Sequence, residues 1–421
     1  MTTIAAATGA PIAVNRRLIA SGIFVLFGLA DIFLFGWFAH KGDATFALSV
    51  SGSVVHVPSI NAPAAAVCYV LGAASILIGL LRAVVDEPTW AKRLSIGLVV
   101  LFFVVSLLCW AYAGSVIPLN AVNLLQSTMN LSIPLVLGAL AGCMCERSGV
   151  INIAIEGQLL FGAFTAAVVA SVAGLWLGLF IGPLAGGLLG VLLAVFAIRF
   201  LVDQIILGVV LNVLASGLTG YLNDRILVTH PNLNTGLTFN PVKIPGLGDI
   251  PIIGPIFFDS TIFLYVTYAM IILVQVGLFS TRWGLRVRAV GEHPTAADTV
   301  GIRVLAIRYR NVILGGLIAG IGGASLTLGS VGTFTKDMSS GLGYIALAAM
   351  IFGRWTPLGA TAAALLFGFA NSLQATLSTI NVPVSSFLLL MAPYVATIIA
   401  VAGLVGRVRA PAADGKPYVK A

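Results

Sequence analysis

Residues 175–199 read LWLGLFIGPLAGGLLGVLLAVFAIR, a stretch with no charged side chain before its final arginine. A helix needs about 20 apolar residues to cross the hydrocarbon core of a bilayer, so this stretch is long enough to span. The whole sequence has the same character, with 59% hydrophobic and 9% charged residues, against roughly 25% charged residues in a typical soluble domain. So few charges cannot cover the water-exposed surface of a 421-residue chain. The sequence therefore predicts an integral membrane protein.

The same apolar pattern recurs along the chain and predicts about twelve transmembrane helices, within a range of about 10 to 12. Helices are expected because a lone segment in lipid must satisfy its own backbone hydrogen bonds. We therefore predict an all-α, polytopic membrane protein. The span at 342–353 is short for a full crossing. The predicted spans cover residues 18–39, 62–84, 94–117, 120–145, 157–173, 175–199, 205–223, 260–280, 310–329, 342–353, 357–377 and 383–405.

The basic residues predict the orientation of the chain, because Lys and Arg collect in the cytoplasmic loops of membrane proteins. With the N-terminus in the cytoplasm, all but four of the 22 Lys and Arg residues fall on the cytoplasmic side. We therefore expect both termini to be cytoplasmic. No cleaved signal peptide is expected, because Arg16 and Arg17 precede a full-length span. The four exceptions are Lys41, Arg225, Lys243 and Lys336.

A glycine recurs at every fourth position from Gly174 to Gly190. This spacing places the glycines on one stripe of a helix, where a second helix can approach closely. Pro183 lies inside the run and permits a kink. The alternative is that glycine is simply frequent in membrane helices. Both interpretations concern packing rather than chemistry.

Motifs for catalysis and nucleotide binding are absent from the sequence. It contains no G-x-x-x-x-G-K-[ST] phosphate loop, no H-E-x-x-H and no G-x-S-x-G. The net charge of +8 is spread over short loops, so nucleic acid is not an expected partner. We expect no enzymatic activity and no cofactor in this chain, which makes an intramembrane enzyme improbable. The four cysteines lie in apolar runs and are expected to be packing residues: Cys68, Cys109, Cys143 and Cys145.

Ionisable residues inside the predicted spans are scarce. Asp31 lies in the first span, and Glu156 adjoins the irregular stretch 148–157. An intramembrane carboxylate marks a function by default, although a hydrogen bond between helices explains Asp31 equally well. Ion-coupled transporters need such groups to bind protons or sodium, so their scarcity favours an external energy source. An ion-coupled secondary transporter stays the alternative, which uptake sensitive to a protonophore but not to ATP depletion would favour.

The longest cytoplasmic loop, residues 281–309, has the punctuation of two short helices. Gly291 ends the first, and Pro294 suits the first turn of the second. The small residues Ala296 and Ala297 are expected on the exposed side of the second helix. A docking element for a cytoplasmic partner and a solvated charged loop both fit this pattern.

Several stretches of the sequence carry a family resemblance. They are ERSGVINIAIEGQ at 146–158, IPIIGPIF at 250–257, RVRAVGEHPTAA at 286–297, the glycine-rich run at 316–323 and GRWTPLG at 353–359. In this order they resemble the simple-sugar and nucleoside permeases of bacterial ABC importers. The first two together are most similar to the nucleoside branch. The resemblance covers residues 119–405.

The resemblance implies three parts. Residues 1–118 are an N-terminal extension with three spans that lies outside the family. Residues 119–405 are the permease core, which contains an outer loop at 226–258 and a coupling loop at 281–309. Residues 406–421 are a basic cytoplasmic tail.

The resemblance also implies partners in a bacterial inner membrane. The permease would pair with a second related permease, as a homodimer or heterodimer, and with two ATP-binding domains. An extracytoplasmic binding protein would deliver the solute, and ATP and Mg²⁺ would bind the partner ATPase. Closure of the ATPase would then switch the side to which the pore opens. The residues that would contact the ATPase are Arg286, Arg288, Gly291, Glu292, Pro294, Ala296, Ala297 and Gly301.

Neutral amide groups in the spans suit an uncharged, hydrogen-bonding solute such as a nucleoside or a sugar. Each amide can equally join two helices by a hydrogen bond. Asn152 and Glu156 are the favoured candidates, because irregular backbone at membrane depth occurs only where it is buried or lines a cavity. The expected residues of the solute pathway are Asn152, Glu156, Gln126, Asn130, Asn212 and Asn371.

Overall fold

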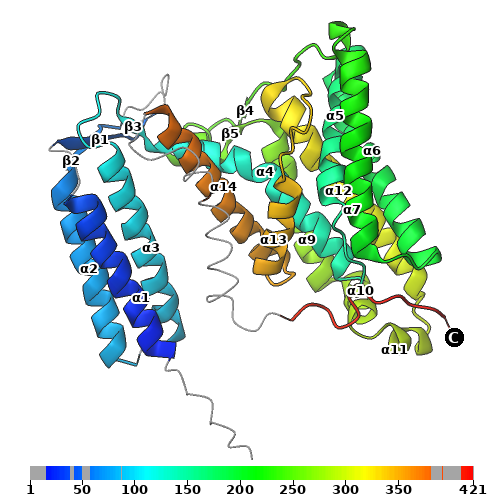
Figure 1. Cartoon of the computed structure of the whole chain (residues 1–421), viewed down its shortest axis with the longest axis horizontal. Helices are drawn as coiled ribbons and strands as arrows, with labels where there is room; N and C mark the ends of the chain where they lie inside the picture. Colours follow the sequence, from blue (N-terminus) through cyan, green and yellow to red (C-terminus); the bar gives the residue numbers. More distant parts are fainter. Residues whose placement is uncertain are drawn as a thin grey trace, which may run out of the picture. The chain divides into compact units, whose positions relative to one another are not determined.

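The protein is predominantly helical, as its apolar pattern predicts (Figure 1). The computed structural model describes residues 16–37, 42–49, 57–86, 88–380, 391 and 409–420. Among these residues, ten helices are long and apolar enough to cross a membrane. They are Arg17–Gly36, Ala64–Val84, Trp90–Ala111, Ala121–Glu146, Ile155–Ala173, Leu175–Arg199, Gln204–Leu227, Ile262–Ser280, Val304–Val331 and Pro357–Thr379.

The prediction of an all-α polytopic membrane protein is confirmed by these ten helices. Nine lie at predicted full-length spans that precede the short one at 342–353, and the tenth lies at the span that follows it. The predicted span at 383–405 falls outside the described residues, apart from Met391. The side of the membrane on which the termini lie stays a prediction.

The chain forms two compact units, and the first ends at Ala121. Its helices are α1 (Arg16–Ala30) continued by η1 (Asp31–Gly36), α2 (Ala64–Val84) and α3 (Thr89–Ala111). Three short strands, which the sequence did not indicate, form a sheet in the order β2-β1-β3. These strands are β1 (Asp43–Ala47), β2 (Ile60–Pro63) and β3 (Leu119–Asn120).

The three helices of the first unit pack closely. A Cβ atom on Gly28 would lie 2.5 Å from the carbonyl oxygen of Gly72, so glycine lets α1 and α2 touch. Asp31 is fully buried and lies against Ser106 of α3. Its carboxyl group is therefore enclosed by the three helices.

The second unit, Val122–Ala421, contains the permease-like motifs. Its elements after α4 (Ala121–Glu146) are α5 (Ile155–Ala173), α6 (Leu175–Ala194), η2 (Val195–Arg199), α7 (Gln204–Leu222), η3 (Asn223–Leu227), η4 (Pro231–Leu233), β4 (Val242–Lys243), α8 (Ile253–Phe257), β5 (Asp259–Ser260), α9 (Ile262–Ser280), α10 (Arg282–Glu292), α11 (Pro294–Thr299), α12 (Val304–Leu326), η5 (Thr327–Val331), α13 (Leu342–Phe352) and α14 (Pro357–Thr379).

The glycine stripe brings α6 against α12, which run side by side in Figure 1. A Cβ atom on Gly186 would lie 2.5 Å from the carbonyl oxygen of Gly316. The expected close approach of a second helix is therefore confirmed, and its partner is the glycine-rich run of α12. Gly174 does not belong to the stripe. It has a φ of 95° and separates α5 from α6.

The short span at 342–353 is α13, a helix of 11 residues that rises only about 16 Å against a hydrocarbon core of about 30 Å. It is therefore half a span. The segment 332–341 before it and the segment 147–154 before α5 are both non-helical. Such backbone at membrane depth must be covered by protein, and the starts of α5 and α13, which follow these segments, meet at the site described below.

The outer loop at 226–258 is largely irregular, as its prolines predict, and folds back onto the core. Strands β4 and β5 pair in antiparallel fashion. The Asn234 amide donates to the carbonyl oxygen of Phe334 at 2.9 Å and accepts from its N–H at 2.8 Å. The Phe239 N–H donates to the carbonyl oxygen of Leu328 in η5, at 2.8 Å. These bonds hold the loop over η5 and the segment 332–341.

Candidate functional site

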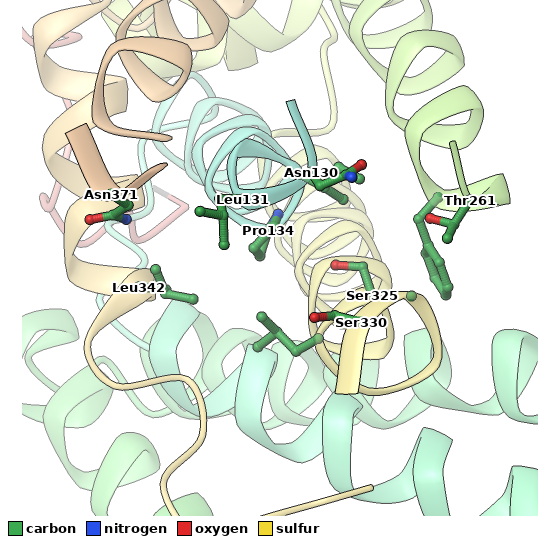
Figure 2. Close-up of a pocket in the computed structure, with 12 residues that line it drawn as sticks. Asn130, Leu131, Pro134, Thr261, Ser325, Ser330, Leu342 and Asn371 are labelled. Atoms are coloured by element: carbon green, nitrogen blue, oxygen red, sulfur yellow. The ribbon is translucent and has the colours of Figure 1, made fainter. Parts of the chain in front are cut away.

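A cavity of about 320 Å³ lies within the core between helices that are distant in sequence (Figure 2). We call it the amide cavity. The residues around it come from α4, α9, α12, η5, α13 and α14. They are Asn130, Leu131, Ile133, Pro134, Thr261, Phe263, Ser325, Leu326, Gly329, Ser330, Leu342 and Asn371.

The backbone beside this cavity is irregular for identifiable reasons. Pro134 lies inside α4 and has no N–H to donate to the carbonyl oxygen of Asn130, four residues earlier. That oxygen is released beside the cavity. On the facing wall, η5 is a π-helical turn that contains Ser330. Such turns widen a helix locally and are frequent at functional sites.

The side chains of the amide cavity retain unused hydrogen-bonding capacity. The Ser260 hydroxyl donates to Asn130 Oδ1 at 2.7 Å, which leaves the two amide hydrogens of Asn130. The Ser325 hydroxyl donates to the carbonyl oxygen of Gly322 at 2.6 Å and can still accept. Asn371 of α14 has no side-chain hydrogen bond within the described part of the chain. The cavity thus offers neutral donors and acceptors.

A second cavity, of about 490 Å³, lies between α5, α7 and the start of α13. We call it the acidic cavity, because two carboxylates line it. The residues around it are Glu156, Gly157, Leu160, Asn212, Val213, Ser216, Gly217, Asp337, Ser339, Ser340, Gly341 and Tyr344.

Glu156 anchors the start of the half-span α13. Its Oε1 accepts from the Ser339 hydroxyl at 2.6 Å and from the Gly341 N–H at 2.8 Å, and its Oε2 accepts from the Gly343 N–H at 2.6 Å. The first N–H groups of a helix have no partner within it and favour a negative charge. The carboxylate therefore satisfies backbone donors that lipid could not.

Asn212 of α7 ties the same region together. Its Oδ1 accepts from the Gly157 N–H at 2.8 Å, and its Nδ2 donates to the Ile153 carbonyl oxygen at 2.9 Å and to the Tyr344 hydroxyl at 3.1 Å. α7 begins at Gln204, whose side chain accepts from the Ile151 N–H at 2.8 Å. Eight residues of helix separate Gln204 from Asn212, or about 12 Å. The irregular backbone before α5 therefore reaches well into the membrane.

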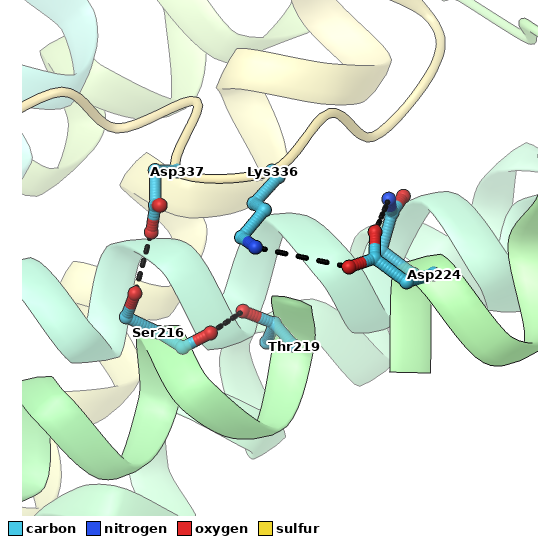
Figure 3. Close-up of polar contacts among 6 residues, drawn as sticks. Ser216, Thr219, Asp224, Lys336 and Asp337 are labelled. Atoms are coloured by element: carbon cyan, nitrogen blue, oxygen red, sulfur yellow. Dashed lines mark hydrogen bonds and ion pairs between the residues drawn. The ribbon is translucent and has the colours of Figure 1, made fainter. Parts of the chain in front are cut away.

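The outer part of the acidic cavity carries exposed charges (Figure 3). The Ser216 hydroxyl donates to Asp337 Oδ1 at 2.5 Å. The neighbouring Lys336 ammonium lies 3.7 Å from Asp224 Oδ2. Both pairs connect the segment before α13 to the region of α7 and η3. Of these four residues, Ser216 and Asp337 line the acidic cavity.

The structure divides the predicted pathway residues between these two cavities. Asn130 and Asn371 line the amide cavity, and Glu156 and Asn212 line the acidic cavity. Gln126 lies one turn before Asn130 and donates to the carbonyl oxygen of Asp259 at 3.0 Å. Their roles in transport stay predictions.

Asn152 occupies a different place from the others. It is fully buried, donates to Gln158 Oε1 at 3.1 Å and belongs to the lining of neither cavity. Sequence reasoning also missed the hydroxyl groups of Thr261, Ser325 and Ser330. Hydroxyl residues are frequent in membrane helices, and a π-helical turn has no pattern that distinguishes it in one sequence.

The predicted punctuation of the coupling loop is present. α10 ends at Glu292, Pro294 begins α11, and Gly301 follows α11 with a φ of 83°. The Thr281 side chain caps α10 by accepting from the Gly284 N–H at 3.1 Å. Of the expected contact residues, the exposed ones are Arg286, Glu292, Ala296 and Gly301, and those partly covered are Arg288 and Pro294.

The expectation that Ala297 is exposed is wrong. Ala297 is only 4% exposed, because it packs with Val290, Val304 and Tyr418. Gly291 is buried as well, since a Cβ atom there would collide with the carbonyl oxygen of Arg147. Only Ala296 of the small pair faces outward. Its place on α11 next to Ala297 could not reveal which of the two a distant segment would cover.

Comparison with known proteins decides the family. Residues 124–402 match the family described as the branched-chain amino acid transport system permease component. The chain belongs to this permease family. It is 41% identical over 307 residues to the guanosine ABC transporter permease protein NupQ of Bacillus subtilis, covering 70% of this chain and 96% of that protein. It is 38% identical over 319 residues to the nucleoside ABC transporter permease protein NupC of Lactococcus lactis, covering 72% and 99%.

A further relative is the putative glucose ABC transporter permease protein TsgC13 of Haloferax volcanii, 33% identical over 60% of this chain and 77% of that protein. No solved structure matches the chain. The first unit precedes the matched residues. Both cavities and the coupling loop lie within them.

The expected family and function are therefore confirmed. The chain is the multi-pass permease component of an ABC importer, and such a permease works with a separate ATPase subunit and a binding protein. Permease components are not themselves enzymes. The ion-coupled alternative gives way to this function.

Proposed function

We propose that this permease imports a nucleoside across a bacterial inner membrane and that the amide cavity lies on the path of the solute. The observation that carries the proposal is the lining of that cavity by neutral amides and hydroxyls between five helices. Its volume of about 320 Å³ lies at the lower end of the range of about 300–1,000 Å³ that ligand pockets occupy. The names of NupQ and NupC support a nucleoside as the solute.

The charge of the lining favours an uncharged solute. Among the described residues, those around the amide cavity include no Asp, Glu, Lys or Arg. A charged solute would lose its hydration there without gaining a counter-charge, which costs several kcal/mol or more. A simple sugar is the second candidate, favoured by the same neutral lining and by the similarity to TsgC13.

The proposal extends to the assembly. The exposed face of α10 and α11 would contact the ATPase, and ATP and Mg²⁺ would bind there, with no cofactor in this chain. Two ATP-binding domains would serve this permease and a second, related one, as a homodimer or heterodimer. The N-terminus and C-terminus would be cytoplasmic, which places α10 and α11 on the side where ATP is available.

The experiment is uptake of radiolabelled guanosine and glucose into proteoliposomes that contain the complete transporter with internal ATP. We expect guanosine to accumulate and glucose not to compete with it. Accumulation of glucose alone would replace the nucleoside by a sugar, and accumulation of neither would contradict both. In the same vesicles, Ala296→Trp should lower uptake about tenfold by blocking the outward face of α11. Uptake equal to the unmodified transporter would contradict the position of the ATPase contact.

A further inference from the structure

Residues 409–420, the tail segment, do not extend freely from the core as a basic tail would. They lie across the end of the core that carries α10 and α11 (Figure 1, red). The Ala413 N–H donates to the carbonyl oxygen of Gly291 at 2.9 Å. The Ala412 N–H donates to Glu292 Oε2 at 3.2 Å. The tail segment is therefore bonded to the last turn of α10.

The tail segment also contacts α11 and the start of α12. Tyr418 is only 7% exposed and packs with Val290, Ala297 and Val304, which come from three successive helices. Asp298 of α11 lies near the Tyr418 hydroxyl, and burial raises the pKa of Tyr418. The side chain thus lies between the two coupling helices and α12, and together with Val290 and Val304 it buries Ala297.

A third set of contacts joins the tail segment to the irregular turn before α5. Arg308 of α12 is 2% exposed and donates from Nη1 to the carbonyl oxygen of Lys416 at 2.9 Å. The carboxyl group of Asp414 lies near Glu146 at the end of α4, and burial raises the pKa of Asp414. Gly415 packs on Ile151, with a φ of 71°. The tail segment therefore contacts buried residues of α4 and α12 and the turn before α5.

We propose that the tail segment is a part of the coupling device: it straps α10 and α11 to the turn at 147–154, so that movement of the coupling helices reaches α5 and α13. This inference rests on the proposed contact between α10, α11 and the ATPase. The turn leads directly to Glu156, which holds the start of α13. A packed and hydrogen-bonded connection of this kind transmits displacement, because buried groups cannot separate without losing their partners.

Tyr418 is a positioning residue in this device. Its ring packs on Ala297, and its removal would loosen the connection between the coupling helices and the turn, which would then depend on the direct contact of Gly291 with Arg147. ATP would then be hydrolysed with fewer solute molecules moved. A residue that only stabilised the fold would instead change transport and hydrolysis together.

The first test measures whether the tail segment covers Ala297 in the full-length permease chain, in membranes prepared without the ATPase. Ala297→Cys and the exposed control Ala296→Cys are labelled with a water-soluble maleimide, and the four native cysteines are all buried. We expect labelling at 297 to be slower than at 296 by about tenfold or more, and deletion of residues 409–421 to bring the two rates together. Equal rates in the full-length chain, or a slow rate at 297 after the deletion, would overturn the seat of the tail segment.

The second test measures ATP hydrolysed per nucleoside transported for Tyr418→Ala and Tyr418→Phe. We expect the ratio to rise about fivefold or more for Tyr418→Ala, with KM for the solute unchanged, and to return near the original value for Tyr418→Phe, which keeps the ring. An unchanged ratio for Tyr418→Ala, with 297 labelled rapidly, would overturn the coupling role. The labelling test does not depend on the ATPase contact, and Ala296→Trp tests that contact alone. Failure of the tail-segment proposal can therefore be distinguished from failure of the proposed function.

Discussion

Polar side chains line both cavities of the core, but they differ in how many internal hydrogen bonds they make. In the amide cavity, Asn130 keeps its two amide hydrogens and Asn371 makes no side-chain bond within the described residues. In the acidic cavity, Glu156 accepts from three groups and Asn212 bonds to three others. A polar group whose capacity is already used cannot bind a solute without breaking an internal bond. The comparison therefore favours the amide cavity for the proposed solute contact and the acidic cavity for support of the fold.

This division follows from the half-span α13. A helix that begins inside the membrane exposes its first N–H groups where no water is available, and each unsatisfied group costs several kcal/mol. Glu156 removes that cost, and the irregular turn at 147–154 brings it to the required depth. At the acidic cavity, the Glu156 side chain at the start of α5 thus accepts hydrogen bonds from the backbone N–H groups at the start of α13.

The largest expected effect comes from Glu156→Ala. The substitution leaves the Gly341 N–H, the Gly343 N–H and the Ser339 hydroxyl without their acceptor, and it should lower the free energy of unfolding by about 3–5 kcal/mol. The measurement is the thermal unfolding temperature of the purified complex. Asp337→Ala is the matched control. It removes an exposed carboxylate bonded to half-buried Ser216, so its cost should stay below about 1 kcal/mol. Equal losses of stability for both variants would contradict the supporting role of Glu156.

A smaller effect, on transport rather than stability, is expected for Asn371→Leu. It removes a donor and an acceptor from the amide cavity, and KM for the nucleoside should rise about 5-fold to 100-fold, which corresponds to about 1–3 kcal/mol. The unfolding temperature should stay close to that of the unmodified complex.

Asn212→Leu is the counterpart in the acidic cavity. It should lower the unfolding temperature, because three internal partners lose their bonds. The comparison between the cavities would be reversed if Asn371→Leu unfolded early and Asn212→Leu changed KM alone.

Much of this architecture could be predicted from the sequence, because each transmembrane helix is recognised from the length of its own apolar run. The glycine run of α6 predicted a close helix contact, since spacing of four is a local property. The partner helix, α12, depended on the three-dimensional arrangement. The punctuation of α10 and α11 was equally local, with Gly291 and Pro294 at the ends of the helices.

The candidate site was harder to predict, because it depends on which distant segments come together. An amide in a membrane helix has the same sequence signature whether it faces a cavity or a neighbouring helix. Asn130 and Asn371 differ from Asn152 only in what other segments place beside them. Ala297 is covered by Tyr418, more than a hundred residues later in the chain. Contacts between distant segments are what a single sequence does not encode locally.

The most direct measurement is photo-crosslinking of the complete transporter with an azido-nucleoside, followed by mass-spectrometric location of the modified peptides. If the amide cavity binds the solute, the label will be found on the peptides that contain Asn130, Ser325, Ser330 and Asn371, and an excess of guanosine will prevent it. Label that guanosine displaces from Asn212, Ser216 and Tyr344 instead would place the solute in the acidic cavity and contradict the account.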